Sequence, residues 1–151
     1  MNIAFLTNNT NITNGWGRFS RELFEAFSGF PGVRFSVFTE ERGSWPGEET
    51  LLRHALRFSH RNAFSASLLH VPHLLYLAHR LRRRLESADV IHALDGYPYG
   101  VLGAMVLRSR QRLVITLQGS YALSAFSHAI ERRLLSSALG RAHAVTAISA
   151  Y

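Results

Sequence analysis

The residues best suited to chemistry follow the first apolar run of the chain. A polar loop after residues 3–7 ends in four residues, Gly15, Trp16, Gly17 and Arg18, and an amphipathic segment comes next. A junction of strand, glycine-bearing loop and helix presents free backbone N–H groups and the positive end of a helix dipole, both of which suit a phosphate. The Arg18 guanidinium adds a bidentate charge partner. We predict that these four residues bind an anionic, phosphate-bearing ligand; the alternative is that the two glycines only shape a turn.

Two later loops carry the other candidate residues. Asp95, Tyr97 and Tyr99 lie in a turn-rich segment after an apolar run at 90–93, and a second apolar run at 113–117 is followed by Gln118, Gly119 and Ser120. Ligands of open α/β sheets bind outside the carboxyl ends of the strands. These loops and the glycine-bearing loop are therefore expected to face one cleft.

The histidines are not expected to bind a metal. His92 ends an apolar run and is expected to be a hydrogen-bonded structural residue. The eight histidines show no spacing typical of metal ligands, and the chain has no cysteine. We therefore expect neither a metal nor another cofactor.

Apolar runs with strand character alternate with segments of helical periodicity. Strands are expected at 3–7, 33–39, 90–93, 113–117 and 144–148, and helices at 18–27, 50–58, 72–85, 101–108 and 127–139. This alternation predicts a doubly wound α/β fold with a mostly parallel sheet and helices on both faces. At 151 residues, the chain is expected to form one domain over 1–151.

The charge of the chain is strongly positive and comes entirely from arginine. All 17 basic residues are arginine, the net charge is +7 and the sequence pI is about 11.0. An arginine excess suggests contact with phosphates, nucleic acid or an anionic membrane, although GC-rich coding also favours arginine. No nucleic-acid-binding motif accompanies the charge, so no nucleic acid partner is expected.

One arginine cluster, formed by Arg80, Arg82, Arg83 and Arg84, has two interpretations. It could place cations favourably at a solvated helix C-terminus, or it could belong to an amphipathic helix lying on anionic lipid. The chain shows no signal peptide and no apolar segment long enough to cross a bilayer. We expect a cytoplasmic protein, with the inner face of the membrane as the alternative position.

The last expected strand is followed by Ser149, Ala150 and Tyr151, where another helix should begin. We therefore expect the chain to be the first half of a larger protein.

Four segments resemble, in order, the N-terminal domain of glycosyltransferase family 4, a group of retaining, nucleotide-sugar-dependent enzymes with the two-domain GT-B fold. The glycine-rich loop and first helix are matched by NGWGRFSREL at 14–23, and the "DvIHaH" strand by DVIHA at 89–93. The "vvTlHG" strand and loop are matched by VITLQG at 114–119, and the "ad.viavS" strand by AHAVTAIS at 142–149. The resemblance spans nearly the whole chain.

The resemblance implies a role for each candidate residue. Gly15 and Gly17 would let the backbone approach the donor diphosphate. Gln118 stands in the catalytic position where the family usually has a histidine near the transferred sugar; an amide can bond a hydroxyl but cannot titrate. The acceptor or sugar would be bound by Asp95, Tyr97, Tyr99, Gly119 and Ser120.

The resemblance also implies the reaction and the missing partner. The chain would be the acceptor-side domain of a retaining hexosyltransferase that moves a sugar from a nucleotide-diphosphate sugar to a hydroxyl. A C-terminal donor-binding domain, in cis or in trans, would supply a paired-glutamate motif that this chain lacks, so the chain alone would be inactive.

Two other classes of protein stay open. One is a non-catalytic binding or scaffold module derived from the same fold. The other is a dinucleotide-binding oxidoreductase domain, whose fingerprint Gly15, Gly17 and Glu40 mimic. However, Ser20 occupies the place of the third glycine, and Gly15 lies eight residues beyond Thr7 rather than at a tight turn.

Overall fold

The computed structural model describes residues 1–53, 65–118 and 125–148, with only the backbone described for 65–69. Five parallel strands form one sheet in the order β2-β1-β3-β4-β5. The strands are β1 (Asn2–Thr7), β2 (Arg34–Thr39), β3 (Val90–Ala93), β4 (Arg112–Leu117) and β5 (Ala144–Ala147). The predicted α/β fold with a parallel sheet is confirmed.

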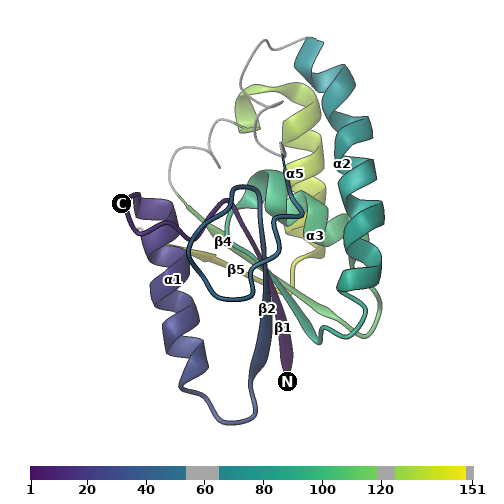
Figure 1. Ribbon diagram of the computed structural model, residues 1–151. Coiled ribbons are helices and arrows are strands. Elements are labelled where there is room, and N and C mark those ends of the chain that lie inside the picture. Colours follow the sequence, from purple (N-terminus) through teal and green to yellow (C-terminus); the bar gives the residue numbers. More distant parts are fainter. Residues whose placement is uncertain (54–64, 119–124, 149–151) are drawn as a thin grey trace.

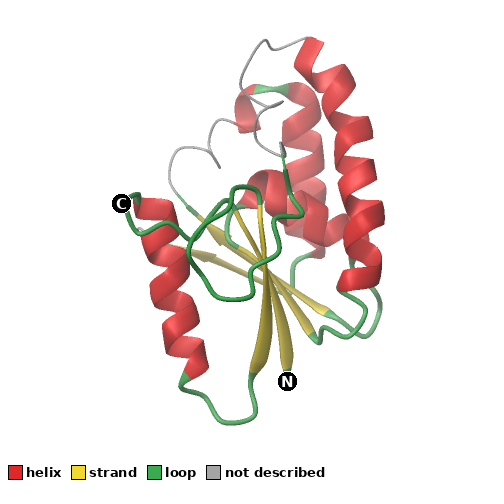
Figure 2. Ribbon diagram, viewed as in Figure 1, coloured by secondary structure: helices red, strands yellow, loops and turns green. Residues whose placement is uncertain are grey.

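The helices cover the two faces of the sheet unequally (Figures 1 and 2). One face carries α1 (Gly15–Ser28), and the other carries α2 (Ser65–Arg84), α3 (Val101–Val106) and α5 (Ala129–Arg141). The reason is the strand order: the chain moves one way from β1 to β2 and the other way from β2 through β3 and β4 to β5, and right-handed crossovers then place α1 on one face and α2, α3 and α5 on the other. No helix in the described ranges is long and apolar enough to cross a membrane.

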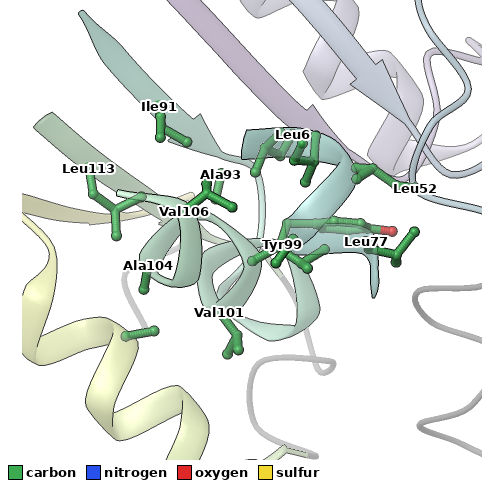
Figure 3. Close-up of a cluster of buried hydrophobic side chains, with 14 of the residues drawn as sticks. Leu6, Leu52, Leu77, Ile91, Ala93, Tyr99, Val101, Ala104, Val106 and Leu113 are labelled. Atoms are coloured by element: carbon green, nitrogen blue, oxygen red, sulfur yellow. The ribbon is translucent and has the colours of Figure 1, made fainter. Parts of the chain in front are cut away.

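The main core lies between the sheet and the three-helix layer. Figure 3 shows Leu6, Ile91 and Leu113 of three neighbouring strands on one side of this cluster, with Leu77 of α2 and Tyr99 among the residues that meet them. A smaller aromatic cluster beneath α1 is built around Phe5 and Phe24, whose ring centroids lie 4.7 Å apart. The central strands are therefore buried on both faces, which explains their continuous apolar runs.

Two helices begin earlier than their sequence patterns predict. α1 begins at Gly15 rather than residue 18, because the Asn14 side chain accepts a hydrogen bond from the Gly17 N–H at 2.8 Å and caps the helix there. α2 is already helical at Ser65 and contains Pro72. A proline inside a helix costs a hydrogen bond, but the buried residues Leu74 and Leu81 on the same helix pack into the core.

Other helical predictions fail in part. Residues 50–53 are not helical; Leu52 instead donates its N–H to the Thr39 carbonyl at 2.9 Å. The rest of the helix predicted at 50–58 lies outside the described residues. In α5, Ile130 is 43 % exposed whereas Glu131 is buried, and the helix continues through Gly140 to Arg141, beyond the predicted end at residue 139.

Candidate functional site

The carboxyl edge of the sheet carries buried side-chain atoms that have no hydrogen-bond partner. Within the described residues, three buried side-chain atoms have no hydrogen-bond partner: Thr39 Oγ1, Asp95 Oδ2 and Gln118 Nε2. Thr39 ends β2, Asp95 lies two residues after β3, and Gln118 directly follows β4. Buried polar atoms are nearly always paired, so three unpaired atoms at one edge identify this edge as the candidate site.

Asp95 is the titratable group of this site. Its side chain is fully buried, and its Oδ1 accepts a hydrogen bond from the Gly96 N–H at 2.6 Å. Burial raises the pKa of Asp95 to about 7, although the backbone N–H groups of Gly96 and Gln118 oppose that rise. The carboxyl group therefore changes between acid and carboxylate near neutral pH and can donate or accept a hydrogen bond there.

Gln118 sits beside Asp95 on the adjacent strand. It is 5 % exposed, and its backbone N–H interacts with the Asp95 carboxylate. Its side-chain amide nitrogen has no hydrogen-bond partner among the described residues. A carboxyl oxygen and an amide donor thus lie unpaired at neighbouring strand ends, an arrangement that suits a hydroxyl-rich ligand. The catalytic role of Gln118 stays a prediction. Gly119 and Ser120 lie outside the described residues.

Trp16 ties the beginning of α1 to the same edge. Its indole Nε1 donates a hydrogen bond to the carbonyl of Leu94 at 3.1 Å, and its ring meets that of Tyr99 edge-on at 6.1 Å between centroids. The residue before Asp95 is therefore joined to the first turn of α1. The positive end of the helix dipole is thereby held at the edge that carries Asp95.

The structure gives the two glycines of this turn different surroundings. A Cβ on Gly15 would meet nothing within 4 Å, and the Gly15 N–H finds no acceptor among the described residues. Gly17 has no such space, because a Cβ there would lie 2.2 Å from the backbone oxygen of Asn11, and its N–H is taken by Asn14. Arg18 is exposed and makes no salt bridge within the described residues. Phosphate binding by this turn stays a prediction.

Tyr97 and Tyr99 lie deeper than a surface loop would place them. Residues Gly96–Gly100 form the buried segment η1, in which the Tyr97 backbone is extended (φ −130°, ψ 128°) and kinks the turn. The Tyr99 hydroxyl donates to Glu40 Oε2 at 2.8 Å and accepts from Asn8 Nδ2 at 3.2 Å, while the Tyr97 hydroxyl lies 2.7 Å from His70 Nδ1. Both rings belong to the core, and their predicted contact with a sugar or acceptor stays untested.

The sequence patterns do not predict that Asn8, Thr39 and Glu40 lie at this site, although the dinucleotide-binding alternative includes Glu40. Asn8 directly follows β1, and Thr39 and Glu40 stand at the end of β2. The signal that could have found them is position alone, because polar residues at the carboxyl ends of parallel strands gather at one edge.

His92 is a structural histidine, as predicted. Its Nε2 lies 2.8 Å from Thr116 Oγ1, and its ring packs 5.2 Å from that of Phe5 between centroids. Burial lowers the pKa of His92 to about 4, so the ring is neutral at physiological pH. In the part of the chain that the structure describes, no group of three or more His, Cys, Asp or Glu side chains could hold a metal ion.

Comparison with known proteins identifies the family of the chain. No individual curated protein matches the chain. The model of Glycosyltransferase Family 4 matches residues 13–151, which begin just before the first turn of α1 and include Asp95 and Gln118. Because the match covers nearly the whole chain, the protein belongs to Glycosyltransferase Family 4 and is a glycosyltransferase domain with a Rossmann-like α/β fold.

Proposed function

We propose that the chain is the acceptor-side domain of a retaining glycosyltransferase of the GT-B type. It would transfer a hexose from a nucleotide-diphosphate sugar to a hydroxyl of an acceptor. A C-terminal donor-binding domain, in cis or in trans, would supply most donor contacts, and the domain would be inactive without it. Membership of the family supports transferase chemistry in general. The finer assignment rests on the four sequence segments and on the carboxyl edge of the sheet.

One observation carries the proposal: the unpaired atoms Asp95 Oδ2 and Gln118 Nε2 lie at adjacent strand ends, and Trp16 holds the start of α1 to the same edge. A sugar needs hydroxyl partners, and a diphosphate needs positive charge. The side chains of Asp95 and Gln118 offer hydrogen bonds to sugar hydroxyls, and the N-terminus of α1 offers positive charge to the diphosphate.

The expected chemistry is largely electrostatic. As the bond between the anomeric carbon and the donor diphosphate breaks, negative charge develops on the leaving oxygen. The Gly15 N–H, the dipole of α1 and the Arg18 guanidinium would stabilise that charge. Gln118 would donate its amide hydrogen to a sugar hydroxyl, and Asp95 would bond the acceptor or the sugar. The proposal requires neither a metal nor a redox cofactor.

The test uses the complete two-domain enzyme and a matched pair of variants. Gly15→Val and Gly140→Val each add the same side chain to a helical position with nothing within 4 Å, but only Gly15 lies at the site. With a panel of nucleotide-diphosphate hexoses, Gly15→Val should lower kcat/KM for the donor by at least about tenfold. Gly140→Val should leave it unchanged, and both should keep the circular dichroism spectrum of the natural protein.

Each failure has its own meaning. Equal kcat/KM for Gly15→Val and the natural enzyme would show that the α1 turn does not bind the diphosphate. A complete protein that transfers no hexose from any donor in the panel would favour the binding or scaffold module instead. The expected cytoplasmic location stays a prediction.

A further inference from the structure

Helix α2 has one buried face and one exposed stripe. Leu74, Leu77 and Leu81 are buried against the sheet. The exposed residues recur at intervals of three and four; this outer stripe of α2 consists of Pro72, Leu75, Tyr76, His79, Arg80 and Arg83. Figure 1 shows α2 on the outside of the three-helix layer. The outer stripe therefore faces away from the core.

The stripe is apolar in its first half and cationic in its second. Leu75 and Tyr76 are adjacent and are 56 % and 55 % exposed. Arg80 and Arg83 follow, with Arg82 beside them, and none of the three has a salt-bridge partner among the described residues. The 20 residues of α2 include no aspartate or glutamate. The surface thus combines exposed apolar area with positive charge that the helix itself does not balance.

An ordinary solvated helix does not have this composition. Such helices carry charges of both signs, which support one another at intervals of four residues. Exposed leucine and tyrosine next to arginine are instead typical of helices at a lipid interface, where aromatic rings lie at headgroup level and cations meet anionic lipid. The Arg80 guanidinium carbon lies 5.9 Å from the centroid of the Tyr76 ring, so the cation and the ring share one patch.

The orientation of α2 places the two halves of the stripe at different ends of the sheet. The Tyr97 hydroxyl contacts His70 near the beginning of the helix, on the side of the carboxyl edge. At the other end, Arg108 donates to the carbonyl of Arg82 at 3.3 Å, close to the start of β4. The apolar half of the stripe is therefore the half nearer the candidate site.

We propose that the outer stripe of α2 binds the surface of an anionic phospholipid bilayer. Leu75 and Tyr76 insert among the headgroups, and Arg80 and Arg83 meet the lipid phosphates. Charge complementarity selects this partner, because the stripe contains cations without a single acid. The proposal does not depend on glycosyl transfer and is tested on the 151-residue chain itself.

The experiment is co-sedimentation with vesicles. The chain should bind phosphatidylcholine vesicles that contain about 30 % phosphatidylglycerol, but bind pure phosphatidylcholine weakly. Arg80→Gln combined with Arg83→Gln should lower the partition coefficient by about 25-fold. Leu75→Gln combined with Tyr76→Gln should lower it at least about tenfold, since the apolar area that enters the interface is lost.

A matched control separates the stripe from net charge. Arg21→Gln combined with Arg42→Gln also removes two positive charges, but Arg21 is on α1 and Arg42 is in the loop after β2. Circular dichroism checks that every variant is folded. Equal losses in the control and in the Arg80/Arg83 variant would overturn the proposal in favour of non-specific attraction. Failure to bind the anionic vesicles would also overturn it, and retention on immobilised polyglutamate in that case would point to an acidic protein partner.

Discussion

Gly17 is the glycine of the first α1 turn that has no room for a side chain, and this makes it a sharp test of the structure. A Cβ at this position would lie 2.2 Å from the backbone oxygen of Asn11, 2.5 Å from its nitrogen and 2.5 Å from Asn9 Oδ1. Two of these contacts are with backbone atoms, so no change of rotamer relieves them. The turn at residues 9–11 would have to move by about 1.2 Å, the difference between 3.4 and 2.2 Å, to restore ordinary contact.

The cost of Gly17→Ala follows from that movement. The shift disturbs the hydrogen bonds that Asn9 Oδ1 accepts from the Asn11 N–H at 2.9 Å and from Asn14 Nδ2 at 3.2 Å. Overpacking costs about 1–3 kcal/mol, and each weakened hydrogen bond about 1 kcal/mol. Alanine regains up to about 1 kcal/mol of helix propensity. The free energy of unfolding should fall by about 2–5 kcal/mol, which corresponds to a Tm lower by about 4–20 °C.

Thermal denaturation followed by circular dichroism measures this effect. The control is Gly15→Ala, two residues away in the same turn, where a Cβ meets nothing within 4 Å; its Tm should stay within about 2 °C of that of the natural chain. If Gly17→Ala melts at the same temperature as Gly15→Ala, the close packing of the turn against Asn11 is refuted.

Three further predictions concern buried polar groups. Burial raises the pKa of Asp95 to about 7, so Asp95→Asn should raise the free energy of unfolding at about pH 7.5 by at most about 4 kcal/mol. Urea denaturation at several pH values should show this gain disappear towards pH 4. Tyr99→Phe should lower the free energy of unfolding by about 1–2 kcal/mol, since Glu40 and Asn8 lose a buried partner; an unchanged urea midpoint would contradict it. Gln111→Leu should cost about 2–3 kcal/mol in the same assay, because its buried amide serves three backbone groups.

The strands could be predicted from sequence because their signal is local. All five observed strands agree with the predicted ranges to within one residue at each end. The central strands β1, β3 and β4, which are largely buried, appear as continuous apolar runs bounded by turn residues, and nothing distant is needed to recognise them.

Helix boundaries and faces depend on information that lies elsewhere in the chain. The start of α1 is determined by the Asn14 cap, and the buried face of α1 includes Phe24 because Phe5 and Phe35 meet its ring. Ala26, two residues further along the same helix, is apolar but exposed. A single-residue error in helical phase is enough to exchange such neighbours.

The candidate site also contains residues that the sequence could predict and residues that it could not. Asp95 and Gln118 could be selected because they follow apolar strands, and the edge of a parallel sheet brings such residues together. The burial of Tyr99 could not be predicted, because its partner Glu40 lies 59 residues earlier in the chain. Only the packed structure shows that this hydroxyl serves the protein interior.

Two buried groups make the stability of the domain respond to pH in opposite directions. The pKa of His92 falls from 6.5 to about 4, so the folded state loses stability as the pH drops through that range. The pKa of Asp95 rises from 3.8 to about 7, so the folded state holds the proton more tightly and loses stability as the pH increases through that range. Each group changes the free energy of unfolding by at most about 1.4 kcal/mol per pH unit. The two changes have opposite signs wherever the pH ranges of the two groups overlap. The contributions of His92 and Asp95 to the free energy of unfolding should therefore nearly cancel from about pH 4.5 to 6, so a change in transfer rate near pH 7, above this range, is where the titration of Asp95 should be sought.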